Sequence, residues 1–211
     1  MQTLVNGIPN YLCSMEEMLD SFEKKGFCLF HQLLPKEDLA MIRQELEAIK
    51  KSEQWKKAGI GKMEELKVDS SQRGDFIHWI DPHSLAPATS RYFEKMDEII
   101  QLLNRSFYLG IRDRECHYTE YPVGTFYKRH VDRHRNQSSR IVSMVFYLNE
   151  NWTEADGGQL MVYHEDGSED CILPQEGLLA VFLSEKEHEV LPTHRVRQSI
   201  TGWMLNEVRL V

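Results

Sequence analysis

The segment FYKRHVD at residues 126–132 ends in a His-x-Asp motif formed by His130 and Asp132. Side chains two positions apart on a β-strand share a face, so this imidazole and this carboxylate can bind one divalent metal ion while Val131 points away. Two ligands leave such an ion under-coordinated, and a third is expected from a distant strand. A single His-x-Asp motif is common by chance, and its alternative reading is a solvated pair at a strand end.

His188, in the segment EHEV at residues 187–190, is the candidate for the third ligand. Two histidines and one carboxylate on one face of an octahedron leave the remaining positions open, as in non-haem Fe(II) oxygenases. His194 competes for the same role. It follows Pro192 in a connector and stands only three residues before Arg197. That distance is too short for an arginine at a separate position on the next strand, which favours His188.

Arg197, nine residues after His188, could bind a dicarboxylate through two parallel hydrogen bonds if its strand carries it toward the metal. Tyr147 could add a hydroxyl to the same carboxylate. A second His-x-Asp motif, at residues 164–166, runs directly into Gly167. A histidine and an aspartate before such a glycine are typical of a polar hairpin end, so this motif is interpreted as structural.

Taken together, these motifs resemble the Fe(II)/2-oxoglutarate dioxygenases of the prolyl 4-hydroxylase superfamily. The closest resemblance is to the prolyl hydroxylases that act on hypoxia-inducible factor and to their bacterial relatives. It covers roughly residues 73–203. Besides the metal motif and Arg197, it is carried by YP at 121–122, RHVD at 129–132, YLN at 147–149, GG at 157–158, Trp203, and RGD at 73–75 followed by Ile77 and Trp79.

The resemblance implies a role for each matching residue. His130, Asp132 and His188 would bind iron, and Arg197 would pair with the distal carboxylate of 2-oxoglutarate. The other implied positions are a hydroxyl donor to that carboxylate at Tyr147, pocket-lining residues at Trp203 and Tyr121, and substrate contacts at Arg73 and Asp75. Two spacings depart from the family pattern: residues 121–130 are one residue shorter, and residues 132–140 are one residue longer.

The implied activity is hydroxylation of a peptidyl residue, with proline as the target and succinate and CO2 as coproducts. The implied cofactors are Fe(II), 2-oxoglutarate and O2, with ascorbate as a possible reductant. One alternative is a hydroxylase of a free amino acid or another small molecule, which a short, fixed loop at 52–72 would favour. Another is a non-catalytic jelly-roll sensor of iron or a dicarboxylate. The presence of all three metal ligands together with Arg197 argues against it, because a site without catalytic activity does not require all four residues.

The elements that must position these residues fall into two halves. Helical periodicity predicts helices at about 15–25, 36–50 and 88–108. A loop at about 52–72 would be the family's finger loop. A short apolar strand is expected at 26–30, and after residue 112 the hydrophobic period approaches two, which predicts strands at about 116–118, 143–148, 159–163, 178–183 and 198–204. We therefore expect an α+β fold, a double-stranded β-helix (jelly roll) buttressed by N-terminal helices. We expect residues 1–211 to form one domain, with mainly helical support and the finger loop over 1–111 and the jelly-roll core over 112–211.

Several other residues have plainer interpretations. Trp79 is expected in the core, and Cys116 is expected to be a small buried hydrophobe. Arg140 is expected to pair internally with a carboxylate such as Asp75. Tyr127 could equally reach the pocket or serve packing. The Lys- and Glu-rich stretch at 50–57 is expected to be solvated.

The net charge of −8 disfavours a nucleic-acid partner. Eleven of the acidic residues, with one basic residue, lie at 150–189, whereas 112–140 hold seven basic and four acidic residues, a local balance that suits a dianionic cosubstrate. The longest apolar run, at 178–183, is too short for a membrane span, and no basic-then-apolar leader opens the sequence. Scattered cysteines at 13, 28, 116 and 171 are typical of reduced thiols. We expect a cytoplasmic protein with no membrane partner.

Overall fold

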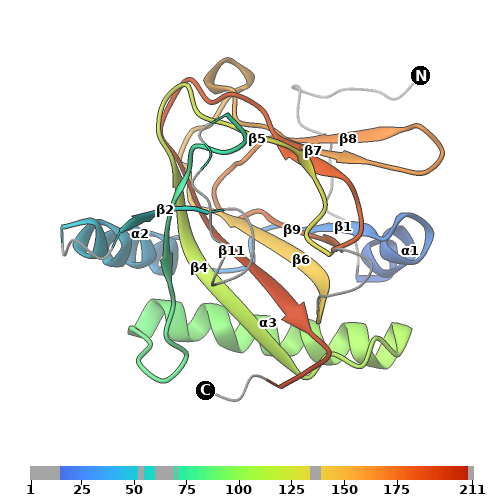
Figure 1. Cartoon of the computed structure of the whole chain (residues 1–211). Helices are drawn as coiled ribbons and strands as arrows, with labels where there is room; N and C mark the ends of the chain where they lie inside the picture. Colours follow the sequence, from blue (N-terminus) through green and yellow to red (C-terminus); the bar gives the residue numbers. More distant parts are fainter. Residues whose placement is uncertain (1–14, 52–54, 60–68, 70, 134–138, 209–211) are drawn as a thin grey trace.

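The computed structural model describes residues 15–51, 55–59, 69, 71–133 and 139–208. Two antiparallel sheets face each other, and the helices lie along the outer side of the larger sheet (Figure 1). The helices are α1 (Met15–Lys25), α2 (Lys36–Lys50), α3 (Pro87–Phe107) and the short 3-10 helix η1 (Glu154–Asp156). The strands are β1 (Phe27–Phe30), β2 (Lys56–Lys57), β3 (Phe76–Trp79), β4 (Asp113–Tyr121), β5 (Tyr127–His130), β6 (Arg140–Tyr147), β7 (Leu160–Tyr163), β8 (Glu169–Ile172), β9 (Leu179–Leu183), β10 (His188–Val190) and β11 (Arg197–Leu205).

The strand order confirms the predicted jelly roll. The larger sheet runs β1-β9-β6-β11-β4-β3-β2, and the smaller sheet runs β5-β10-β7-β8. From β4 onward the chain passes repeatedly from one sheet to the other: β4, β6, β9 and β11 belong to the larger sheet, and β5, β7, β8 and β10 to the smaller. Ligands far apart in sequence can therefore meet in the space between the sheets.

The predicted helices form at their expected places. Acidic residues in the first turn of α1 and Lys24 and Lys25 in its last turn complement the helix dipole. The helix ends at Gly26, whose φ of 60° is the left-handed conformation that glycine adopts without strain. In α3, Pro87 occupies the first turn, where its missing N–H costs no hydrogen bond.

Two hydrophobic clusters divide the core between them. One lies between the helices and the larger sheet and includes Leu46, Met96 and Phe146. The other lies between the two sheets and includes Tyr147 and Phe182. Because side chains alternate along a strand, β6 contributes residues to both clusters, whereas β11 contributes Ile200 and Met204 to the first cluster only. The larger sheet thus has one face in a helix-covered core and the other facing the smaller sheet, where polar side chains also gather.

The structure adds three strands to the predicted set, β2, β3 and β8, and it gives the strands expected to carry His130 and His188 as β5 and β10. Within the predicted finger loop at 52–72, residues 56–57 form β2 and pair with β3. Residues 52–54, 60–68 and 70 of this loop lie outside the described residues. In the described part of the chain, no helix has the length and apolarity that crossing a membrane requires.

Candidate metal and cosubstrate site

Three potential metal ligands converge between the smaller and larger sheets. His130 is the last residue of β5 and His188 is the first of β10, and the two are paired directly across the antiparallel ladder. Asp132 lies in a bend just beyond β5. The predicted proximity of His130 and Asp132 is confirmed, although β5 ends at His130 and Asp132 follows in a bend rather than on the strand itself.

The potential ligand atoms of these three residues all lie within 4.8 Å of one another. The Nε2 atom of His130 is 3.6 Å from Oδ1 of Asp132, and the Nε2 atom of His188 is 3.5 Å from Oδ2 of the same carboxylate. Two imidazole nitrogens and one carboxylate on one side of a common point match the facial set of non-haem Fe(II) sites. The donor chemistry therefore fits Fe(II).

Both histidine rings are held in the orientation that a metal ligand needs. Nδ1 of His130 is 2.7 Å from the carbonyl oxygen of Lys128, and Nδ1 of His188 is 3.0 Å from that of Lys186. A carbonyl only accepts, so each Nδ1 carries the proton and each Nε2 presents its lone pair. Burial also lowers the pKa of His188, which keeps this ring neutral and able to coordinate.

The Asp132 carboxylate is fixed by neighbours from β6 and from the turn after β9. The Ser143 hydroxyl on β6 donates to Oδ2 over 2.7 Å and also lies 2.9 Å from the Ser184 hydroxyl. The backbone N–H of Asp132 donates to the Ser184 carbonyl. Burial alone would raise the pKa of Asp132, but attraction to the His188 and His130 rings in their protonated form and the Ser143 hydrogen bond hold this pKa well below its usual value. The carboxylate is thus ionised and ready to bind a cation.

Arg197 occupies the first position of β11, opposite Tyr121 on β4. Its side chain is 1% exposed, and its guanidinium carbon lies 5.0 Å from the ring centre of Tyr121 and 5.1 Å from that of Tyr147. Nε donates to the Gly158 carbonyl. A Cβ on Gly158 would lie 2.9 Å from the Arg197 side chain, and its φ of 66° also favours glycine, so the GG motif makes room for the arginine.

The Tyr147 hydroxyl is buried and has no hydrogen-bond partner among the described residues. Burial raises the pKa of Tyr147 to about 12, so the hydroxyl keeps its proton and can donate. A buried donor without a partner is costly, and one beside a buried guanidinium is suited to a carboxylate. Arg197 and Tyr147 therefore fit the distal carboxylate of 2-oxoglutarate, and the ring of Tyr121 forms one side of the same space.

Trp203 lies on the inner face of β11, and its buried Nε1 also has no hydrogen-bond partner among the described residues. The guanidinium of Arg140 stacks 3.5 Å above its ring and donates to Glu115. The internal pairing expected for Arg140 thus involves Glu115, whereas Asp75 pairs with Arg73. The expectation of a core Trp79 was wrong: this residue is 47% exposed.

Arg73 and Asp75 form a paired unit beside the site. Nε and Nη2 of Arg73 donate to the two oxygens of Asp75, over 2.7 and 2.6 Å, and Asp75 is 1% exposed. The guanidinium carbon of Arg73 lies 4.2 Å from the ring centre of Tyr127. A groove of about 250 Å³ runs beside this pair, with Phe76 and Phe126 in its lining. The pair is held internally and forms one wall of this groove.

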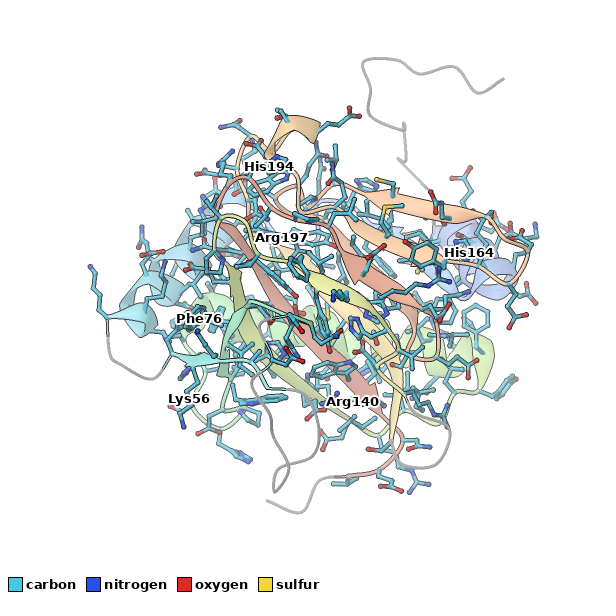
Figure 2. All side chains as sticks on the ribbon, turned by 45° about the horizontal axis from the view of Figure 1, so that its top comes forward. Lys56, Phe76, Arg140, His164, His194 and Arg197 are labelled. Atoms are coloured by element: carbon cyan, nitrogen blue, oxygen red, sulfur yellow. The ribbon has the colours of Figure 1, made fainter. Side chains whose placement is uncertain are left out.

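The other candidate histidines lie elsewhere. His194 bonds through Nδ1 to the carbonyl of Ala155 in η1, and His164 follows β7 and lies close to Asp170; both are labelled in Figure 2. Sequence reasoning missed Ser143 and Ser184. Their only sequence signal is the inward position of Ser143 in the alternating pattern of β6, while the location of Ser184 depends on the turn after β9.

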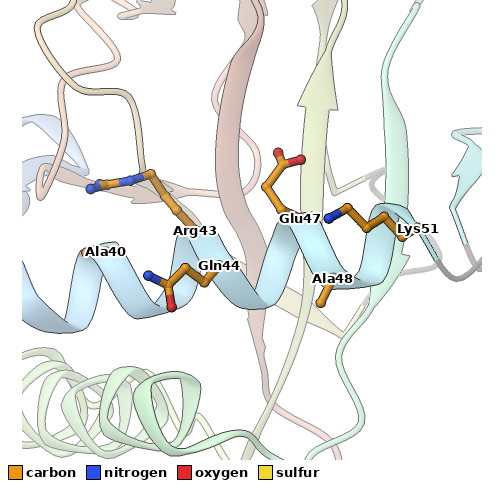
Figure 3. A pocket seen from close by; sticks show the side chains of 6 residues that line it. All are labelled: Ala40, Arg43, Gln44, Glu47, Ala48 and Lys51. Atoms are coloured by element: carbon orange, nitrogen blue, oxygen red, sulfur yellow. The ribbon is translucent and has the colours of Figure 1, made fainter.

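A shallow depression on the outer face of α2 is a separate feature (Figure 3). Two of its charged residues are engaged in ion pairs, Arg43 with Glu150 and Glu176 and Glu47 with Lys50. The groups suited to metal and dicarboxylate chemistry lie between the sheets, not here.

Residues 116–205 match the profile of the 2OG-Fe(II) oxygenase superfamily. The sequence is also similar to Egl nine homolog 1 from Homo sapiens, with 29% identity over 93% of this chain and 47% of that protein. This chain spans about half the length of the curated relatives it matches.

Two solved structures are similar over nearly the whole fold. The crystal structure of a Pseudomonas putida prolyl-4-hydroxylase has a TM-score of 0.81 and 38% identity, covering 90% of this chain and 98% of that one. A prolyl hydroxylase in complex with a hypoxia-inducible factor oxygen degradation domain peptide fragment, from Trichoplax adhaerens, has a TM-score of 0.82 and 28% identity, covering 90% and 87%.

Proposed function

This chain belongs to the 2OG-Fe(II) oxygenase superfamily, and we propose that it uses Fe(II), 2-oxoglutarate and O2 to hydroxylate a prolyl residue of a protein or peptide. The observation that carries the proposal is the arrangement of His130, Asp132 and His188, with both Nε2 atoms directed at the carboxylate. The unpartnered Tyr147 hydroxyl beside Arg197 supports 2-oxoglutarate as the cosubstrate.

Different residues of the chain bind the metal, orient the cosubstrate and exclude water. Bound Fe(II) supplies the chemistry that couples oxidative decarboxylation of 2-oxoglutarate, giving succinate and CO2, to hydroxylation of a substrate C–H bond. His130, Asp132 and His188 would hold the metal as three protein ligands. Arg197 and Tyr147 orient the cosubstrate through its distal carboxylate. The apolar surroundings between the sheets exclude water from the reaction.

Proline as the target draws support from the relatives named above, one of which binds a peptide fragment of hypoxia-inducible factor. The groove beside Arg73 and Asp75 offers an apolar surface that an extended peptide could occupy. In this proposal Arg73 and Asp75 shape the wall of the groove, and Lys57 lies at the same groove.

Anaerobic titration tests the metal and cosubstrate part of the proposal. Adding 2-oxoglutarate to the Fe(II)-loaded protein should produce a weak visible charge-transfer band. His130→Ala should abolish the band, whereas His194→Ala, a matched change outside the site, should retain it. Absence of the band in the wild-type protein would contradict the dioxygenase assignment.

A substrate search tests the target. Proteins of a lysate incubated with the enzyme, Fe(II) and 2-oxoglutarate should gain one oxygen atom on proline, detected by mass spectrometry of peptides. The His130→Ala protein is the control. Oxygen addition confined to free amino acids or other metabolites would instead support a small-molecule hydroxylase.

Two finer points belong to the proposal. We propose that ascorbate serves as a reductant, so its omission should lower the number of turnovers in the same assay without preventing a first one. We also propose a reducing location such as the cytoplasm, since Cys28, Cys116 and Cys171 are free thiols. Alkylation during lysis should find these cysteines unpaired, and a disulfide would contradict this location.

A further inference from the structure

The second His-x-Asp motif of the sequence has a structural connection to the metal site. His164 follows β7, and its side chain is 6% exposed. Its Nε2 lies 2.7 Å from Oδ2 of Asp170 on β8, and its Nδ1 lies 3.3 Å from Nζ of Lys186. A lysine ammonium only donates, so Nδ1 accepts from Lys186 and Nε2 carries the proton that it donates to Asp170. His164 thus connects Asp170 on β8 with Lys186, because each of its ring nitrogens makes one of these two hydrogen bonds.

Lys186 lies in the turn at residues 184–187, which connects β9 to β10. The carbonyl of Lys186 accepts the hydrogen bond from Nδ1 of His188, over 3.0 Å. The carbonyl of Ser184, in the same turn, accepts from the backbone N–H groups of Asp132 and Arg133. Two of the three candidate metal ligands therefore take their position from this one turn.

The side chain of Lys186 passes close to Gly26 at the end of α1. Its Cε lies 3.0 Å from the position that a Cβ on Gly26 would occupy, so the absence of a side chain at the end of α1 lets the lysine stem pass. The backbone of the turn is tied to the same hairpin, because Tyr163, next to His164, donates its N–H to the carbonyl of Glu187. The lysine thus reaches His164 in a defined direction.

We propose that His164 is a positioning residue for the metal ligand His188, acting through Lys186. The acceptor at Nδ1 holds the ammonium of Lys186, and the held lysine fixes the turn so that its carbonyl meets Nδ1 of His188. Asp170 orients the His164 ring by accepting from Nε2. The hydrogen-bond partner of a metal-bound histidine fixes the orientation of its ring and affects metal affinity. For His188 this partner is the backbone carbonyl of Lys186, whose position depends on the contact between the Lys186 side chain and His164. This inference rests on the metal site of the proposed function.

Co(II) titration of the metal-free protein, followed by its visible ligand-field bands, tests the proposal without requiring turnover. Lys186→Met keeps the stem and removes the donor, and should weaken Co(II) binding about tenfold and alter the bands. In His164→Asn the amide oxygen can take the place of Nδ1 and accept from Lys186, so binding should stay near the wild-type value. In His164→Gln the amide reaches Asp170 instead, and binding should weaken as in Lys186→Met.

The double variant His164→Gln/Lys186→Met should bind Co(II) no more weakly than Lys186→Met alone, because the two changes break one connection. Lys95→Met, at an exposed lysine of α3 that pairs with Glu98, is the matched control and should leave binding unchanged. Wild-type affinity in both His164→Gln and Lys186→Met would overturn the inference, even if their thermal stability fell. Failure of the wild-type protein to bind Co(II) would overturn the proposed metal site as well.

Discussion

The imidazole of His130 lies face to face with the ring of Tyr127, with ring centres 3.5 Å apart and planes inclined by 16°. The guanidinium of Arg73 covers Tyr127, with its central carbon 4.2 Å from the ring centre. The candidate metal ligand is therefore supported from one side by a stack whose outer member is itself paired with Asp75. Since Tyr127 is three residues before His130, strand β5 carries both the ligand and its support.

Removing this stack should weaken metal binding. Tyr127→Ala is expected to lower Co(II) affinity about five- to tenfold, because an aromatic pair contributes roughly 1 kcal/mol to holding the ring in place. Tyr127→Phe keeps the stack and should bind nearly as the wild type does. Tyr108→Ala, at a residue that is 89% exposed, is the control. Equal affinities in all four proteins would mean that the stack plays no part in orienting His130.

Arg197→Lys should separate cosubstrate binding from metal binding. The ammonium of lysine cannot form the two parallel hydrogen bonds of the guanidinium, and it would lose the bond to Gly158. We expect the dissociation constant of 2-oxoglutarate to rise at least tenfold, with Co(II) affinity within twofold of the wild type. Calorimetric titration with 2-oxoglutarate measures the first quantity. Unchanged 2-oxoglutarate affinity would show that the distal carboxylate binds elsewhere.

Tyr147→Phe should have opposite effects on stability and on binding. The buried hydroxyl has no partner among the described residues, so its removal should leave the free energy of unfolding of the ligand-free protein unchanged or raise it by about 1 kcal/mol. Removal of a donor to a carboxylate should at the same time weaken 2-oxoglutarate binding about tenfold. Urea unfolding and calorimetry check the two halves. A clear loss of stability would indicate an internal partner for this hydroxyl.

The three candidate metal ligands His130, Asp132 and His188 could be predicted from the sequence because residue types and their spacing are local properties. Asp132 shows the limit of that reasoning. Period-two alternation places residues 130 and 132 on one face only if the strand continues, and β5 ends at His130. The end is set by where the partner strand β10 begins, since His188 pairs with His130 across the ladder. The spacing of residues in the sequence does not predict the register between β5 and β10.

Trp79 and Ser184 show two further limits. Alternation tells which side of β3 the indole occupies, but its exposure depends on what covers that sheet edge, and the adjoining strand β2 has only two residues. Ser184 contributes through a backbone carbonyl and a hydroxyl placed by a turn, so its residue type gives no signal. Contacts made by backbone groups across sheets require the folded structure.

Asp75→Asn should destabilise the protein because it leaves a buried guanidinium without its counter-charge. The side chain of Asp75 is fully buried and that of Arg73 is 15% exposed. Removing one member of such a pair typically costs 3–5 kcal/mol, so we expect a loss of about 3 kcal/mol. Adding Arg73→Met to Asp75→Asn should restore part of the lost stability. Chemical denaturation measures the free energy of unfolding of the single and the double variant. A double variant less stable than the single one would show that Arg73 is stabilised by other groups.

His117 should make stability fall as the pH is lowered through mildly acidic values. Burial between Trp79 and Trp203 lowers the pKa of His117 from 6.5 to about 4, and Nδ1 lies 2.8 Å from the Thr119 hydroxyl. Below pH 6.5 the unfolded chain binds a proton that the folded chain does not, so the free energy of unfolding decreases until about pH 4 and is unaffected above pH 7.

The full effect is on the order of 3 kcal/mol, because each unit of difference in pKa corresponds to about 1.4 kcal/mol. His117→Asn removes the titration while its amide can still reach Thr119. Urea unfolding of the metal-free wild type and variant at several pH values between 4 and 8 isolates the contribution, since the other histidines titrate equally in both proteins. The wild type should lose stability relative to the variant as the pH falls from 6.5 to 4. Parallel curves would mean that His117 is accessible to protons in the folded protein and that its ring is not held neutral by burial.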